Sequence, residues 1–170
     1  NGCPQLKFNR FYVQDKETSN SSEFTDFASL PTTGRIVSLD LGTKWIGVAV
    51  SDELQMLTRP VRTITRTSWK KTLLLVKDIL SEFDAVALVI GLPCNFDGTE
   101  SEMSGEARRL ARSFWLSLEI PVFLQDERAT SYEAKRRLWE RGVDLKSTKQ
   151  HVDSEAAAII LSDFLDRSRR

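Results

Sequence analysis

Asp40-Leu41-Gly42-Thr43-Lys44-Trp45-Ile46-Gly47-Val48-Ala49-Val50 is the stretch that decides the fold of this chain. It indicates a strand that carries one carboxylate, a glycine turn and a second, apolar strand. An acidic side chain at the end of a buried strand is costly unless a basic group, a metal ion or helix-end N–H groups meet it. Gly42 allows the backbone to turn sharply or a ligand to come close. Asp40 is therefore a candidate site residue, with a purely structural role as the alternative.

The composition is that of an ordinary globular protein with one domain. The 170 residues suffice for a hydrophobic core, and 41% are apolar and 28% charged. No apolar run reaches the roughly 18 residues of a membrane span, so none is expected. The two cysteines, Cys3 and Cys94, are too few for a disulfide framework or a zinc site. We therefore expect a protein of a reducing compartment, a cytoplasmic one or one of an organelle interior.

The net charge gives no sign of nucleic-acid binding, because 24 basic residues balance 24 acidic ones. The basic residues nevertheless cluster, and a basic stripe can follow phosphates without raising the net charge. The clustered residues are Arg108, Arg109, Arg112, Lys135, Arg136, Arg137, Arg141, Lys146 and Lys149. Solvated helix faces are the alternative explanation.

The chain divides near residue 33. Residues 1–33 are rich in Ser, Thr, Asn and acidic residues, and we expect a flexible or surface-docked extension. Its apolar residues predict a short amphipathic turn that docks on the domain: Phe24, Phe27, Ala28 and Leu30. Residues 34–170 form the predicted domain.

Within that domain, hydrophobic periodicity predicts alternating strands and helices. We expect strands at about 35–41, 45–51, 57–64, 85–90 and 121–124, and helices at about 69–80, 102–117, 131–141 and 152–166. Thr130 and Glu133 form a capping-box signature for the third helix. The first two strands, joined by a tight turn, should be antiparallel. The order predicts an α/β fold, a mixed sheet with helices on both faces.

Acidic residues stand at three points where ligands gather in such sheets, the carboxyl ends of strands. Asp40 ends the first strand, and Asp126 and Glu127 follow the last. Asp153 opens the final helix on its apolar face, since Ala157 is its i+4 neighbour. The alternatives are a salt bridge to Arg128 for the middle pair and a favourable helix dipole for Asp153.

Converging carboxylates predict a metal site, because divalent cations offset their mutual repulsion. Hard oxygen ligands favour Mg²⁺ or Mn²⁺. Two such ions about 4 Å apart can activate a water molecule and stabilise the leaving oxygen of a phosphodiester. The only histidine, His151, is expected at the surface. Lys44 and, more weakly, Thr43 and Asn95 are candidates for contacting phosphate.

Four blocks together resemble the YqgF family, also called RuvX, of RNase-H-like nucleases. They are Asp40-x-Gly42-x-Lys44-x-x-Gly47-Val48-Ala49; Gly91-Leu92-Pro93 with Asp97-Gly98-Thr99; Asp126-Glu127-Arg128-x-Thr130 with Glu133-Ala134 and Leu138; and Val152-Asp153-x-x-Ala156-Ala157 with Ile159-Ile160-Leu161. The resemblance covers about residues 34–167. The chain departs from the family pattern at Phe96, Ala129 and Glu155, where Met, Leu and a small apolar residue are common.

The resemblance implies an RNase-H-like fold with strand order 3-2-1-4-5. It implies a catalytic and metal-binding set of Asp40, Glu127 and Asp153, with Asp126 as a neighbour, and Mg²⁺ or Mn²⁺ as cofactor. The implied activity is hydrolysis of phosphodiester bonds in 5′-end maturation of pre-16S rRNA, or cleavage of Holliday junctions. The expected partner is nucleic acid, held by Lys44, Asn95, Arg109, Arg112, Arg128 and Lys149.

Two other functions stay open from the residues alone. Asp40-x-Gly42-Thr43 also resembles the first phosphate loop of actin-like and sugar-kinase ATPases, but those proteins need two such domains. A nucleic-acid-binding ribosome-assembly factor without catalysis is the other alternative. The sequence is compatible with a monomer or a homodimer.

Overall fold

A five-stranded sheet forms the centre of the molecule in a computed structural model that describes residues 27–93, 101–126 and 149–169. The strands lie in the order β3-β2-β1-β4-β5. Their bounds are Ile36–Leu41 (β1), Trp45–Ser51 (β2), Thr58–Thr65 (β3), Ala87–Leu92 (β4) and Val122–Asp126 (β5). β2 pairs antiparallel with β1 and β3, whereas β4 pairs parallel with β1 and β5. The predicted mixed sheet and its 3-2-1-4-5 order are confirmed.

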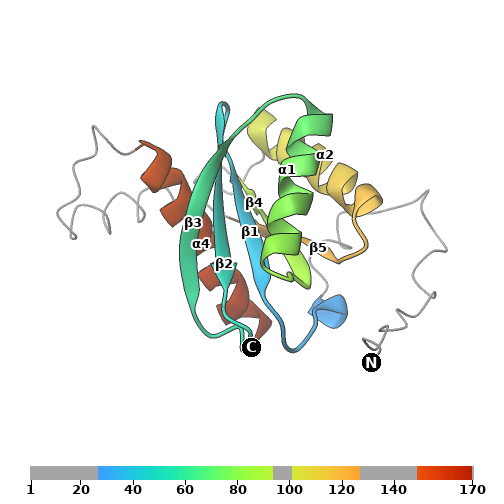
Figure 1. Ribbon diagram of the computed structural model, residues 1–170, viewed down its shortest axis with the longest axis vertical. Helices are drawn as coiled ribbons and strands as arrows, with labels where there is room; N and C mark the ends of the chain where they lie inside the picture. Colours follow the sequence, from blue (N-terminus) through green and yellow to red (C-terminus); the bar gives the residue numbers. More distant parts are fainter. Residues whose placement is uncertain (1–26, 94–100, 127–148, 170) are drawn as a thin grey trace.

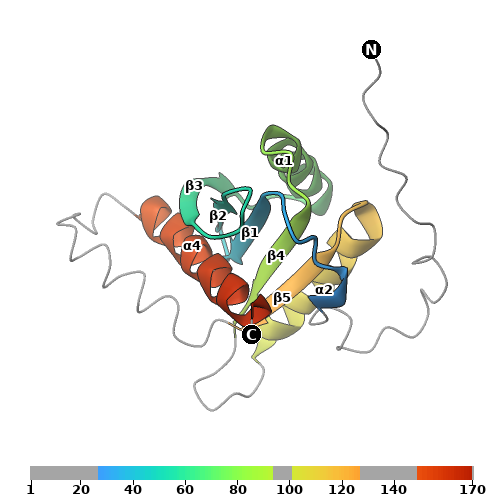
Figure 2. The ribbon, with the colours of Figure 1, turned by 90° about the horizontal axis from the view of Figure 1, so that it is seen from below.

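Helices cover both faces of this sheet and make three layers (Figures 1 and 2). α4 (Lys149–Ser168) lies on one face, and α1 (Trp69–Glu82) and α2 (Glu102–Ser117) lie on the other. Alternation along the strands explains why both faces are apolar. In β1, Val37 and Leu39 join the core under α1 and α2, while Ile36 joins the core under α4.

α1 and α2, which cover the sheet face opposite α4, form at the positions that the apolar periodicity predicts. In α1 the buried side chains are Thr72, Val76, Ile79 and Leu80. Trp69 and Leu73, which stand at helical spacing from Val76 and Leu80, are more exposed. α2 begins after Ser101, whose Oγ accepts from the backbone N of Ser104. Ser104 Oγ in turn donates to the carbonyl of Pro93, which ties the start of α2 to the end of β4.

α4 begins at Lys149, one turn before the predicted start at residue 152. Asp153 therefore lies in the second turn of the helix rather than in the first. The predicted helix at 131–141 lies outside the described residues. No helix in the described ranges is long and apolar enough to cross a membrane.

The segment that precedes the domain docks on the α4 face. Its 3-10 turn η2 (Phe27–Ser29) places Phe27 against two core rings, with centroid distances of 5.3 Å to Phe164 and 6.4 Å to Phe123. Arg167 lies over the Phe27 ring at 5.8 Å, and Leu30 packs on the same cluster. Phe27 and Leu30 therefore pack on the domain, whereas residues 1–26 lie outside the described residues.

Candidate active site

Asp40 faces α4 because of its position in the sheet. It is the cross-strand partner of Gly47, and opposed residues of an antiparallel pair point to the same face. It is also two residues from Ser38, whose Oγ donates to the carbonyl of Ala157 in α4 at 2.7 Å. Both relations place the Asp40 side chain on the sheet face that α4 covers.

Gly47 brings Asp153 to the same place. A Cβ atom added to Gly47 would lie 1.9 Å from the carbonyl oxygen of Asp153 and 2.9 Å from the nitrogen of Ser154. The backbone of α4 therefore occupies the space that any side chain at position 47 would need. Since Gly47 is opposite Asp40, the two acidic residues lie next to each other across this contact.

Small residues and two hydrogen bonds hold α4 in this position. Ala49 packs against Ala157 and Ala158. Thr58 Oγ1 donates to the carbonyl of Ala158 at 3.1 Å, in addition to the bond from Ser38. Asp153 lies one helical turn before Ala157, on the same side of the helix. The direction from Ser38 to Asp40 along β1 is therefore the same as the direction from Ala157 to Asp153 along α4.

The helix-dipole explanation of Asp153 loses its support in this geometry. The dipole effect falls off within the first turn, and Asp153 is in the second. Asp153 and Asp40 are both partly exposed.

Asp126 is not brought onto the Asp40 face. It ends β5, where Val122 and Leu124 alternate with it and belong to the core under α1 and α2. The intervening Gln125 faces α4 and accepts a hydrogen bond from Arg167 at 3.0 Å. Glu127, the other acidic residue expected here, lies outside the described residues. Within residues 27–93, 101–126 and 149–169, no three His, Cys, Asp or Glu residues form a metal-binding group.

Arg66 stabilises the turn that follows Asp40 through hydrogen bonds to its backbone. Its Nη1 donates to the carbonyl of Gly42 at 3.2 Å, and its backbone N donates to the carbonyl of Lys44 at 2.9 Å. Its guanidinium also forms an ion pair with Glu106 of α2. Arg66 thereby joins the β1–β2 turn to α2. Sequence reasoning missed this residue, because an arginine after a strand carries no motif.

The predicted phosphate-contacting residues fall into two groups. Lys44 is exposed in the β1–β2 turn, at the edge where Asp40 lies. Arg109 and Arg112 are exposed on α2, so they lie on the opposite side of the sheet from α4. Three side chains lie outside the description: Asn95, Arg128 and Lys149.

A family model described as "RuvX: Holliday junction resolvase" matches residues 34–167, which include every residue of this site. The chain belongs to the RuvX family. The assignment makes it a nuclease with an RNase-H-like fold, in agreement with the strand order.

Relatives of this RuvX-family chain include a protein of Cereibacter sphaeroides (strain ATCC 17029) that is 41% identical over 140 residues. That match covers 82% of this chain and 88% of the relative, which carries the name "Putative pre-16S rRNA nuclease". A protein of the same name from Anaeromyxobacter dehalogenans (strain 2CP-C) is 42% identical over 137 residues, covering 78% and 97% of the two chains.

Among solved structures, Thermus thermophilus RuvC is similar with a TM-score of 0.49 and 16% identity, covering 78% of this chain and 95% of that one. The fowlpox virus Holliday junction resolvase has a TM-score of 0.49 and 12% identity, covering 78% and 99%.

Proposed function

We propose that this RuvX-family protein is a divalent-metal-dependent nuclease whose favoured substrate is the 5′ end of pre-16S rRNA. The names of its relatives support this substrate. The proposal includes Asp40, Asp153 and Glu127 as catalytic and metal-binding residues and a cytoplasmic location. The observation that supports it is the contact between Gly47 and the backbone of Asp153, because Gly47 is the cross-strand partner of Asp40 and a side chain at position 47 would keep α4 away from it.

The donor set suits Mg²⁺ or Mn²⁺. Two carboxylates at close range disfavour each other's ionised form, and a dication removes that cost. Carboxylate oxygens are the ligands that these hard cations prefer. A divalent cation bound there would supply an activated water and stabilise the leaving oxygen of the phosphodiester.

The chain's own residues supply rigidity. Asp40 is carried by a strand, and Asp153 by a helix whose backbone is bonded to Ser38 and Thr58. Sites on rigid elements hold reacting groups more closely than sites on loops. Lys44, exposed in the adjoining turn, offers a positive charge to the phosphate next to the cut.

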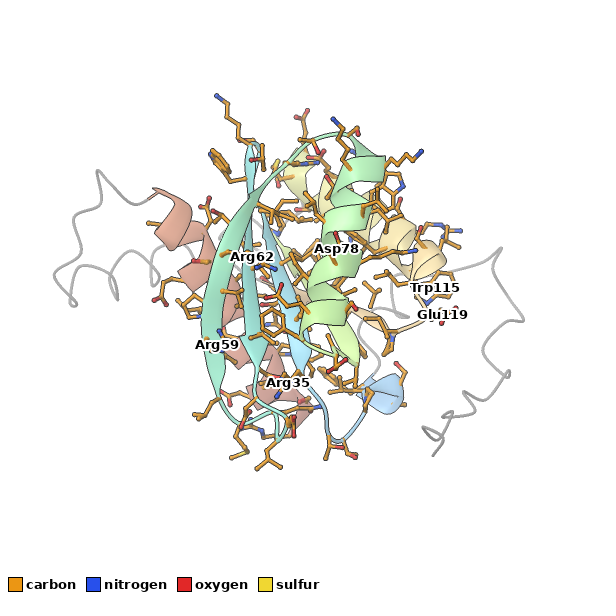
Figure 3. The ribbon with its side chains drawn as sticks, viewed as in Figure 1. Arg35, Arg59, Arg62, Asp78, Trp115 and Glu119 are labelled. Carbon is orange, nitrogen blue, oxygen red and sulfur yellow. The ribbon has the colours of Figure 1, made fainter. Side chains whose placement is uncertain are left out.

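The test incubates the full chain with pre-16S rRNA and with a four-way DNA junction, each with Mg²⁺, Mn²⁺ or EDTA. We expect cleavage of the RNA with either metal and none with EDTA. Asp153→Asn should abolish it, because an amide cannot offset the charge of a dication. Asp78→Asn is the matched control, since Asp78 is exposed on α1, away from the site (Figure 3).

Each pattern of products decides between the candidate functions. Cleavage of the junction alone would identify a Holliday-junction endonuclease, the activity named in the family description. Tight binding of RNA without cleavage in any metal would identify a non-catalytic ribosome-assembly factor. Cleavage that survives EDTA, or survives Asp153→Asn, would overturn the metal site.

A further inference from the structure

A cavity of about 140 Å³ lies behind the acidic residues, on the other face of the sheet. Leu41 and Ile46 form part of its wall. These two residues adjoin Asp40 and Gly47 in the chain, so alternation turns them away from α4 toward α1 and α2. The cavity and the carboxylates therefore share one edge of the same two strands.

Aromatic rings form a second part of the wall. Trp69, at the start of α1, meets Phe114 of α2 edge to face, with ring centroids 4.9 Å apart and an angle of 66°. Phe114 is completely buried, whereas Trp69 is 36% exposed. The buried Phe114 ring holds the Trp69 ring in place, and the Trp69 ring is accessible to a ligand from solvent.

Thr72 supplies a polar group that the fold leaves unused. Its side chain lines the cavity and the residue is only 4% exposed. Its Oγ1 has no hydrogen-bond partner within the described part of the chain. An unpaired buried hydroxyl is unfavourable, so a ligand atom that donates to it or accepts from it gains from the pairing.

Size limits what can enter. A cavity of about 150 Å³ in an apolar core binds one benzene ring. The present cavity therefore fits one six-membered ring, whereas a purine has two fused rings. A pyrimidine base combines the matching size with a flat face for Trp69 and a polar edge for Thr72. Unpaired bases are commonly recognised by stacking on aromatic side chains together with hydrogen bonds to their edges.

We propose that this cavity binds a single pyrimidine base of an unpaired nucleotide and so gives the protein a base preference near the cut. The inference rests on the proposed function for the presence of a nucleic-acid substrate. Arg109, exposed on α2 beside the cavity-lining Leu110, adds a positive charge for the attached backbone. Arg66 also lines the cavity, and its guanidinium is already engaged by Glu106 and the Gly42 carbonyl.

The test measures binding of the full chain in EDTA to single-stranded oligonucleotides of equal length at one salt concentration. The probes are oligo(U) and oligo(A) as RNA, and oligo(dT) and oligo(dA) as DNA. We expect the pyrimidine strands to bind about tenfold more tightly, the size of one base–aromatic stacking interaction. Comparing oligo(U) with oligo(dT) shows which nucleic acid supplies the base.

Two variants locate the effect in the cavity. Thr72→Val keeps the shape of the side chain but removes the hydroxyl, and should lower oligo(U) affinity about fivefold while leaving oligo(A) unchanged. Thr65→Val, at an exposed position of β3, is its control. Trp69→Ala should remove the preference for pyrimidines, whereas Trp115→Ala, outside the cavity lining, should preserve it (Figure 3).

Equal binding of oligo(U) and oligo(A) by the wild type would overturn this inference and leave the nuclease intact. The same holds if Thr72→Val raises the melting temperature with no change in oligo(U) affinity, because the hydroxyl would then serve no ligand. A pyrimidine preference that depends on Thr72 in a protein that cuts nothing would support the cavity and overturn the proposed function. Failure to bind any strand would overturn both.

Discussion

The two faces of the sheet differ sharply at the edge where β1 turns into β2, although the same two strands build both. On the α4 face the strands present Ser38, Gly47 and Ala49, and the helix backbone reaches the sheet. On the α1–α2 face they present Leu41 and Ile46, and a cavity is left between sheet and helices. The size of the side chains at alternate positions therefore decides whether a helix packs closely on the sheet or a cavity with room for a ligand remains.

This difference separates two tasks. The close face holds the backbone of Asp153 against Gly47, opposite Asp40, and the proposed metal chemistry needs such rigid placement. The open face keeps a buried hydroxyl and an accessible ring, which suit recognition. Variants on each face should therefore change different properties.

The largest effect is expected from Asp40→Asn. Cleavage should fall by roughly a hundredfold or more, because even groups that only support a metal ligand cost about 10–100-fold when removed. The melting temperature without metal should stay constant or rise, since one of two repelling charges is gone. Cleavage assays and thermal melts measure the two properties.

Asp126→Asn is the control for the loss of a carboxylate, because Asp126 lies on the sheet face opposite to Asp40. It should retain cleavage. If Asp126→Asn lowered cleavage as much as Asp40→Asn, the site would not be confined to the α4 face of the sheet. A sharp fall in the melting temperature of Asp40→Asn would show instead that Asp40 stabilises the fold through an ion pair.

Gly47→Ala should affect both stability and activity. The new Cβ would clash with the Asp153 carbonyl at 1.9 Å, so α4 must shift. Overpacking of this kind costs about 1–3 kcal/mol, and a displacement near 1 Å can lower activity up to roughly a hundredfold. Urea unfolding and cleavage rates measure the two effects.

Gly105→Ala in α2 is the matched substitution on the other face. Its Cβ would meet only Arg109 Nη1 at 3.6 Å, an ordinary contact. It should stabilise the protein by about 0.4–1 kcal/mol, because alanine restricts the unfolded chain. If Gly47→Ala is equally tolerated, the close packing of α4 does not position the site.

A smaller effect is expected from removing Arg109 and Arg112 together. Each lost phosphate contact should flatten the dependence of log affinity on log salt by about 0.7–0.9. Binding of metal should hardly change, since α2 and α4 cover opposite faces. Fluorescence anisotropy at several salt concentrations measures the slope.

Arg59→Ala serves as the comparison for this pair, since Arg59 lies on β3 over the Phe83 ring, 5.5 Å from its centroid (Figure 3). Its slope should equal that of the wild type. An unchanged slope in the Arg109 and Arg112 variant would make that part of α2 a solvated helix face.

The smallest effect is expected at the far end of the sheet, in Asp52→Asn. Backbone N–H groups of Leu57 and Met56 donate to Asp52 and hold the pKa of its carboxyl below the ordinary 3.8. A lowered folded pKa contributes stability at neutral pH, and this contribution is lost as the pH falls through 3.8 and below.

As the pH is lowered from neutral to about 3, the melting temperature of Asp52→Asn should therefore fall less than that of the wild type. Asp78→Asn is again the control. Cleavage at neutral pH should be unchanged, because Asp52 follows the last residue of β2, whereas Gly47, the partner of Asp40, lies near its start. A loss of activity in Asp52→Asn would mean that the two ends of the sheet are coupled.

Much of the fold could be predicted because hydrophobic periodicity reports burial directly. The helix at 102–117 was predicted with its observed bounds, and the first three strands within one residue. The strand predicted at 121–124 was too short. Pairing with Gly91 and Leu92 of β4 extends it through Gln125 and Asp126, which are polar and carry no strand signal of their own.

That extension matters for the site. Once Asp126 belongs to the strand, alternation assigns it to the opposite face from Asp40. Asp40 and Asp153 could be selected from sequence, because a carboxylate on an apolar face needs a partner. The roles of Asp40, Glu127 and Asp153 stay predictions. The cavity, with Arg66, Thr72 and Trp69, had no sequence signal.

The sequence by itself determined the alternation of the strands, the positions of α1 and α2, the glycine opposite Asp40 and the acidic residues. These follow from local preferences and from the period of apolar residues, which a single chain segment expresses. Only the tertiary structure decided that the Asp153 backbone rests on Gly47, that Asp126 faces away, and that a cavity remains beside Thr72. The physical reason is that these features depend on the distance between layers, and that distance is set jointly by side chains far apart in the chain.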